Sequence, residues 1–143
     1  MAEFKSSAID CGVVEAVQPQ AFEVVVIGGG PAGMAAALAA HKAGARVAIV
    51  EREQHLGGIL RQCIHPGFGL SHFKQELTGP EYAQRFIDQV HATDIALFLN
   101  SMVIGIDSGE PTGDTSVHTV TLMSTAGMRQ LTGRAIVHTN GCR

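Results

Sequence analysis

Three glycines in the first quarter of the chain have a spacing that can hold phosphate. Gly28, Gly30 and Gly33 fill the glycine positions of G-x-G-x-x-G, a pattern that binds a dinucleotide when it follows a strand and opens a helix. We expect Gly28 to permit a tight turn, Gly30 to let a diphosphate approach the backbone, and Gly33 to let the helix pack closely on the strand. Unpaired N–H groups and the positive end of the helix dipole would stabilise the phosphates without a lysine.

A carboxylate follows these glycines at a matching distance. Glu51 ends the apolar run that begins at Arg46, about 20 residues past the glycines, where an acid accepts hydrogen bonds from ribose hydroxyls. Glycines with this spacing also occur in ordinary strand-to-helix turns. The acid and the flanking elements together are therefore what favour dinucleotide binding.

The elements that must position these residues form a strand, a helix and a second strand. The β-branched run Phe22 to Ile27 predicts a strand buried on both faces of a parallel sheet. The alanine-rich stretch Pro31 to Ala43 predicts a helix ended by Gly44, and Arg46 to Glu51 predicts the second strand. This is a Rossmann-type unit, for which a right-handed crossover is expected.

A long segment and a second helix come next. Residues Gln54 to Leu77 show no clear periodicity and are interpreted as a long loop of the functional kind. Thr78 and Glu81 have the spacing of a capping box. The apolar residues that follow recur on one helical face, and they are Tyr82, Phe86, Ile87 and Val90.

The last part of the chain predicts strands only. Ile95 to Leu99 is expected to be the third parallel strand and Arg134 to His138 the last strand. Between them, three runs separated by turn residues predict an antiparallel meander, namely Met102 to Ile106, Val117 to Met123 and Arg129 to Leu131. The predicted fold class is α/β, with a Rossmann-like parallel sheet and an antiparallel β-meander.

The domain boundaries follow from this order of elements. Residues 1–21 are interpreted as an amino-terminal extension with a short strand around Val13 to Val17, and residues 22–143 as a partial nucleotide-binding domain. No element follows the last strand to cover the sheet, so we expect the chain to stop before the domain is complete.

Composition limits the classes of partner. The chain has 143 residues, 45% of them hydrophobic and 16% charged, which suits one folded domain. A net charge of −3 makes nucleic acid a poor partner, and no apolar run reaches the length of a membrane span. The three cysteines, Cys11, Cys63 and Cys142, are odd in number and widely spaced, which favours reduced thiols and a cytoplasmic protein.

The residues around the glycines resemble a known superfamily. The run from Val24 to Gly33, then Glu51-Arg52 and Leu56-Gly57-Gly58, is similar to the pyridine nucleotide-disulfide oxidoreductases, FAD-dependent enzymes with two dinucleotide-binding domains. The resemblance implies FAD rather than NAD, with Gly57 and Gly58 near the flavin side of FAD. It also implies NAD(P)H as co-substrate of the full-length enzyme.

The resemblance also assigns roles further along the chain. It places the backbone of Met102 and Val103 at the adenine, and a turn of the family at Thr139-Asn140-Gly141. The residues that we expect to bind the cofactor are Gly28, Gly30, Pro31, Ala32, Gly33, Glu51, Arg52, Gly57, Gly58, Val103, Thr139 and Gly141. For Arg52, a solvated charge after a strand is an equally good interpretation.

Two departures from the superfamily affect the chemistry. Its disulfide reductases have two closely spaced redox cysteines after the paired glycines, whereas Cys63 is alone, so dithiol chemistry is not expected. Cys63 and His65 are weak catalytic candidates near the flavin ring, and a buried thiol with a hydrogen-bonded loop histidine is the simpler interpretation. The seven histidines are scattered, so no metal site is predicted.

The predicted function is the FAD-binding portion of a flavin-dependent oxidoreductase, which moves hydride or electrons between NAD(P)H or a small-molecule donor and an acceptor. The family is enzymatic, although these residues alone need not turn over substrate. A homo-oligomer or a partner subunit fits such a portion. Two alternatives stay open: an NAD-dependent dehydrogenase domain and a non-catalytic nucleotide-binding subunit.

Overall fold

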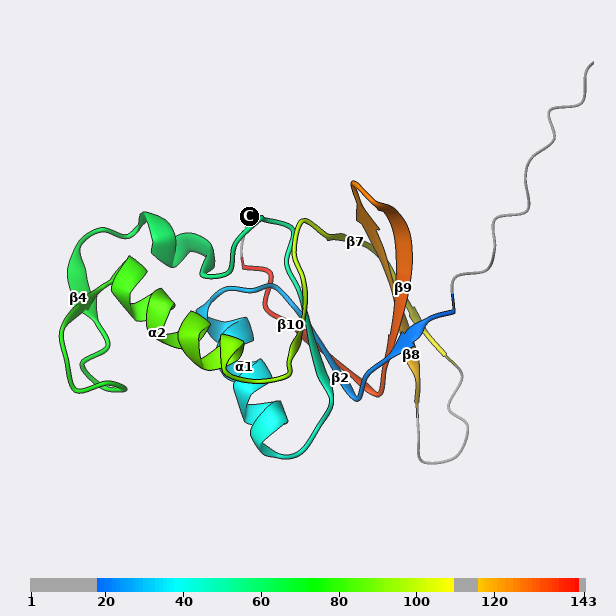
Figure 1. Ribbon diagram of the computed structural model, residues 1–143, viewed down its shortest axis with the longest axis horizontal. Helices are drawn as coiled ribbons and strands as arrows, with labels where there is room; N and C mark the ends of the chain where they lie inside the picture. Colours follow the sequence, from blue (N-terminus) through cyan, green and yellow to red (C-terminus); the bar gives the residue numbers. More distant parts are fainter. Residues whose placement is uncertain (1–17, 110–115, 142–143) are drawn as a thin grey trace, which may run out of the picture.

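The chain folds into three layers around one parallel sheet (Figure 1). The computed structural model describes residues 18–109 and 116–141. Two helices cover one face of the parallel sheet, and an antiparallel sheet covers the other face. The α/β fold class and the combination of parallel sheet and meander are confirmed.

The central sheet has four parallel strands in the order β10-β2-β3-β6. These strands are β2 (Val24–Ile27), β3 (Val47–Val50), β6 (Ala96–Phe98) and β10 (Ala135–His138). Each of the four strands lies within the run that the sequence predicted for it. Helix α1 (Pro31–Lys42) connects β2 to β3, so the predicted strand, helix, strand unit is confirmed.

The side chains of β2 and β3 alternate between two apolar cores. Val26 and Ile49 pack with the helices, in a cluster that includes Met34 of α1 and Phe86. Val25 and Val50 pack on the other face, in a cluster with residues of the antiparallel sheet. Burial on both faces is the reason that these strands read as continuous apolar runs rather than as alternating ones.

The antiparallel sheet has the order β1-β9-β8-β7. Strands β7 (Met102–Ser108), β8 (His118–Ser124) and β9 (Gly127–Gly133) form the predicted meander. Strand β1 (Gln20–Ala21) pairs in parallel with β9, so the last two residues of the predicted extension join this sheet. The predicted strand around Val13 to Val17 lies outside the described residues.

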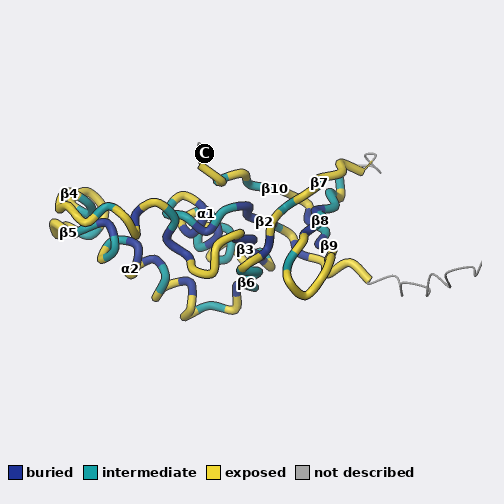
Figure 2. The backbone as a smooth tube through the Cα atoms, turned by 90° about the horizontal axis from the view of Figure 1, so that it is seen from above, coloured by how far each residue is buried: buried dark blue, intermediate teal, exposed yellow. Residues whose placement is uncertain are grey.

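The segment predicted as one long loop contains short elements instead. It includes the 3₁₀ helix η1 (Gly58–Gln62) and the antiparallel pair β4 (Pro66–Phe68) and β5 (Leu77–Thr78). The prediction of one long loop missed these elements, because elements of two to five residues are too short to show a period. Figure 2 shows β4 and β5 at the end of the molecule away from the meander.

Helix α2 (Gly79–His91) begins with the predicted capping box. The Thr78 N–H donates to Glu81 Oε2 at 2.8 Å, and the Glu81 N–H donates to Thr78 Oγ1 at 3.4 Å. The buried face of α2 includes Ala83, Phe86 and Val90, and it packs beside α1 on the parallel sheet. The prediction of an amphipathic capped helix is confirmed.

Candidate functional site

The turn after β2 requires glycine at its first position. Gly28 has a φ of +109°, and a Cβ there would lie 2.5 Å from the carbonyl oxygen of Thr139. The Gly28 N–H donates to Val50 O at 2.8 Å. A side chain at this position would therefore be strained and would also collide with backbone.

The absence of a side chain has different consequences at Gly33 and at Gly30. A Cβ on Gly33 would lie 1.8 Å from Gly28 O and 2.6 Å from Thr139 Oγ1, so this glycine lets α1 pack directly on the turn. A Cβ on Gly30 would meet no atom within 4 Å. The structure of the chain itself therefore leaves room for a side chain at Gly30, and the open space is available to a ligand.

The amino terminus of α1 leaves its amides free of side-chain caps. Gly30 is the N-cap and Pro31 the first helical residue, with no side-chain cap and no acidic residue in the first turn. Ala32 is exposed. Amide donors and the positive end of a helix dipole, with no carboxylate in the first turn, form a region suited to a phosphate.

Glu51 fastens the glycine turn to the end of β3. Its side chain is buried, and Oε2 accepts a hydrogen bond of 2.7 Å from the Gly29 N–H. Oε1 accepts a second one of 2.9 Å from the Glu53 N–H. Since a carboxylate has about four acceptor positions, two remain beyond these two hydrogen bonds.

The paired glycines lie against the same turn. The Gly57 N–H donates to Gly29 O at 2.8 Å, and a Cβ on Gly58 would lie 3.2 Å from Gly30 Cα. The segment after β3 thus runs directly beside the open space at Gly30. A ligand there would meet backbone of both glycine groups.

Thr139 closes the turn from the side of β10. Its hydroxyl lies 2.9 Å from Ile27 O and 3.0 Å from Gly28 O, and its N–H donates to Ile27 O at 2.8 Å. Through these contacts Thr139 holds the glycine turn in place. Gly141, two residues later, is exposed and has a φ of +72°.

The other predicted residues lie further from this turn. Arg52 is exposed and pairs with Glu53, with 3.3 Å between Nε and Oε1. Val103 is half-buried against the core below the meander. Cys63 and His65 follow η1: the Cys63 carbonyl accepts the Gly79 N–H at 2.8 Å, and the His65 ring lies 5.3 Å from that of Phe68.

Two further glycines fit tightly and were missed by sequence reasoning. A Cβ on Gly29 would lie 2.4 Å from Leu56 Cδ2 and 3.1 Å from Glu51 Oε2. A Cβ on Gly79 would lie 2.4 Å from Leu60 O and 2.6 Å from Cys63 O. Nothing local marks these positions, because the atoms that they approach come from distant residues.

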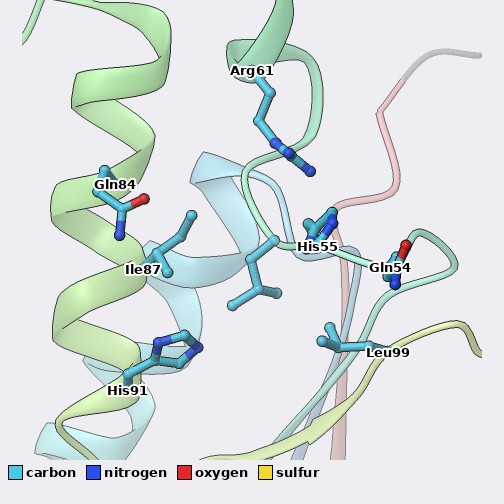
Figure 3. Close-up of a pocket in the computed structure, with 8 residues that line it drawn as sticks. Gln54, His55, Arg61, Gln84, Ile87, His91 and Leu99 are labelled. Carbon is cyan, nitrogen blue, oxygen red and sulfur yellow. The ribbon is translucent and has the colours of Figure 1, made fainter.

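A cavity beside α2 was also missed. It has a volume of about 290 Å³ and lies between α2, the segment after β3 and the end of β6. Figure 3 shows side chains from these three regions around it. The lining residues are Gln54, His55, Leu56, Arg61, Gln84, Ile87, His91 and Leu99.

Residues 18–109 and 116–141 contain neither a candidate metal centre nor a candidate membrane-spanning helix. Over these ranges, no three or more histidine, cysteine, aspartate or glutamate side chains form a group that could hold a metal ion. Within the same ranges, no helix is both long enough and apolar enough to cross a membrane.

Comparison with known proteins agrees with this geometry. A family model described as FAD dependent oxidoreductase matches residues 23–91, just under half of the chain. A ferredoxin–NADP reductase of Streptococcus pneumoniae serotype 19F (strain G54) is 36% identical over 98 residues, which are 64% of this chain and 29% of the relative. A soluble pyridine nucleotide transhydrogenase of Chromohalobacter salexigens is 59% identical over 46 residues, 32% of this chain and 9% of the relative.

Solved structures show the same fold. A thioredoxin reductase from Gloeobacter violaceus matches 85% of this chain and 35% of its own, with a TM-score of 0.65 and 26% identity. An L-proline dehydrogenase from P. horikoshii matches 89% of this chain and 24% of its own, with a TM-score of 0.72 and 20% identity. The chain therefore spans about a third or less of the length of these relatives.

Proposed function

We propose that this chain, which is similar to FAD-dependent oxidoreductases in sequence and fold, binds FAD and forms the amino-terminal, flavin-binding portion of such an enzyme. The observation that carries the proposal is the open space at Gly30, between uncapped amides of α1 and the paired glycines. When bound, FAD supplies the capacity to accept and release hydride or electrons.

The residues of the chain fit the diphosphate of this cofactor. Gly30, Pro31, Ala32 and Gly33 open α1. Pro31 has no N–H, but the other amides can donate to phosphate oxygens while the helix dipole stabilises the phosphate charge. Gly28 and Thr139 hold the turn in the shape that presents these amides. A Cβ at Gly30 would have no atom of another part of the chain within 4 Å, so the approach to this backbone is open.

Other residues would orient the two ends of the cofactor. The free acceptor positions of Glu51 would take the ribose hydroxyls, with Arg52 beside the adenosine and the backbone of Val103 at the adenine. Support for the adenine position comes from the Ser101 N–H, which donates to Glu51 O at 3.0 Å, so the start of β7 is near Glu51. Gly57, Gly58 and Gly141 would line the side toward the flavin.

The wider function concerns the full-length enzyme. We propose residues 22–143 as part of its FAD-binding domain, NAD(P)H as co-substrate, a small-molecule substrate or acceptor, no nucleic acid partner and a cytoplasmic location. A homo-oligomer or a partner subunit is part of the same proposal. Cys63 and His65 stay weak catalytic candidates, because their hydrogen bonds are with η1, β4 and α2 rather than with the glycine turn.

The proposal can be tested by titration of the purified chain. FAD, NAD⁺ and ADP are added separately, and binding is followed by calorimetry and, for FAD, by the shift of the flavin absorbance. We expect FAD and ADP to bind, and we expect NAD⁺ to bind at least tenfold more weakly than FAD. Tighter binding of NAD⁺ would favour the dehydrogenase alternative, and absence of binding for all three compounds would refute the proposal.

A second measurement separates an enzyme portion from a passive binder. NADPH or NADH is added without oxygen to the FAD-loaded protein, first with the chain alone and then with a version extended to the length of the relatives. Bleaching of the flavin in the extended protein supports the oxidoreductase. A flavin that stays oxidised in both proteins supports the non-catalytic subunit.

A further inference from the structure

The cavity beside α2 combines an apolar base with polar side chains that can donate hydrogen bonds. Leu56 is 4% exposed, and Ile87 and Leu99 are half-buried. The remaining lining residues are exposed, and they are Gln54, His55, Arg61, Gln84 and His91. None of the eight lining residues is a carboxylate.

Arg61 has no anionic partner in the described part of the chain. The ion pairs found there join His41 with Asp94, Arg52 with Glu53, and Arg134 with Glu23. In Figure 3 the guanidinium of Arg61 points from η1 toward His55, and the ring of His91 lies across the cavity at the end of α2. An unpaired guanidinium that faces a cavity is a suitable donor group for an oxyanion.

Acidic side chains next to the lining residues are already engaged. Glu53 precedes Gln54 and pairs with Arg52. Asp88 lies on α2 and accepts a hydrogen bond of 2.7 Å from Gln84 Nε2. One of the two N–H donors of Gln84 Nε2 is thus engaged by Asp88. No described carboxylate lies within 4 Å of the Arg61, His55 or His91 nitrogens.

We propose that this cavity binds a small molecule that carries both an oxyanion, as a phosphate ester or a carboxylate, and an apolar group. Arg61 donates to the oxyanion with His55 and His91 beside it, and the apolar group packs on Leu56, Ile87 and Leu99. None of the eight lining residues belongs to the set expected to hold the dinucleotide. The site adjoins the FAD site proposed above, because Leu56 also packs against Gly29 of the turn, but its polar lining residues are different ones.

Calorimetry on the whole chain tests this proposal with phenyl phosphate and benzoate as probes and phenol as the uncharged control. Saturating ADP is present throughout, so that phosphate binding at the glycine turn is blocked. We expect phenyl phosphate or benzoate to bind, and phenol to bind at least tenfold more weakly. Absence of binding for both anionic probes, or equal binding of phenol, would overturn the proposal.

Two variants locate the binding. Arg61→Met keeps the aliphatic part of the side chain and removes the guanidinium, and we expect about tenfold weaker binding of the anionic probe. Gln84→Trp, on the exposed face of α2, fills the cavity and should abolish binding even if Arg61→Met fails to fold. The matched control is Arg134→Gln, which removes a positive charge elsewhere and should bind as the unmodified protein does. Unchanged binding in folded Gln84→Trp would overturn the assignment.

Discussion

The glycine turn and the cavity beside α2 adjoin each other at Leu56, which packs against Gly29 and lines the cavity, and they are built in contrasting ways. At the turn, backbone atoms provide the surface, and Gly28, Gly33, Glu51 and Thr139 fix it through contacts of a few ångströms. At the cavity, side chains provide the surface, and five of the eight are exposed. A substitution at a packed position of the turn should therefore change both ligand binding and the free energy of unfolding. A substitution at the cavity should change binding while the fold is kept.

The largest expected effect is at the packed position of the turn. Gly33→Ala would place a Cβ 1.8 Å from the Gly28 carbonyl oxygen, so α1 or β2 must move. We expect a loss of about 3 kcal/mol in the free energy of unfolding, at the upper end for overpacked sites, measured by urea denaturation. Unfolding at the urea concentration of the unmodified protein would show that the turn can adapt to a side chain and is not fixed by its contacts.

Glu51→Gln should have the next largest effect. An amide has one oxygen where the carboxylate has two, so the N–H of either Gly29 or Glu53 loses its acceptor and faces the amide nitrogen. The loss should be about 2 kcal/mol in the free energy of unfolding. Glu53→Gln is the control: this side chain is exposed, and its loss should stay within about 0.5 kcal/mol.

Gly30→Ala should separate binding from stability within the turn itself. Its Cβ meets no atom of the chain within 4 Å, and Gly30 has a φ of −74° that alanine adopts without strain. We expect a change in the free energy of unfolding below about 1 kcal/mol, and about tenfold weaker binding of ADP by calorimetry because the methyl group occupies the diphosphate position. Unchanged affinity for ADP would show that the diphosphate does not approach Gly30.

A smaller effect is expected on the cavity side, at the start of α2. Thr78→Ala removes the side-chain oxygen that accepts the Glu81 N–H, and should cost about 1 kcal/mol in the free energy of unfolding. Thr78→Ser, which keeps the hydroxyl, should retain most of that stability. Equal losses for the two substitutions would mean that the methyl group, rather than the cap, matters at this position.

The smallest effect is a dependence on pH. Hydrogen bonds from the Thr78 N–H and then from its hydroxyl, with Arg85 nearby, lower the pKa of Glu81. A carboxyl whose pKa is lowered on folding adds stability above its ordinary pKa, and this stability is lost as the pH falls through the lowered pKa. The advantage of the unmodified protein over Glu81→Gln should therefore shrink in acid, as seen by thermal unfolding at several pH values. A constant difference would contradict this.

Most of the turn could be predicted because its signals are local. Gly28, Gly30 and Gly33 follow an apolar run and open an alanine-rich stretch, and Thr78 with Glu81 marks the start of α2. Each signal depends on neighbours within a few positions, where backbone sterics and helix geometry determine the outcome. The short elements that follow residue 54 could not be predicted. Strands β4 and β5, for example, are strands only because each pairs with the other.

The sequence by itself determined a strand, a helix and a second strand around a glycine-rich turn, because local periodicity and glycine spacing specify that unit. Only the tertiary structure decided that Thr139 bonds to the carbonyl of Ile27, 112 residues away along the chain, and that Gly29 must be small beneath Leu56. It also decided that Arg61, His55 and His91 face one cavity. Contacts of this kind depend on how the layers pack, and no local pattern records them.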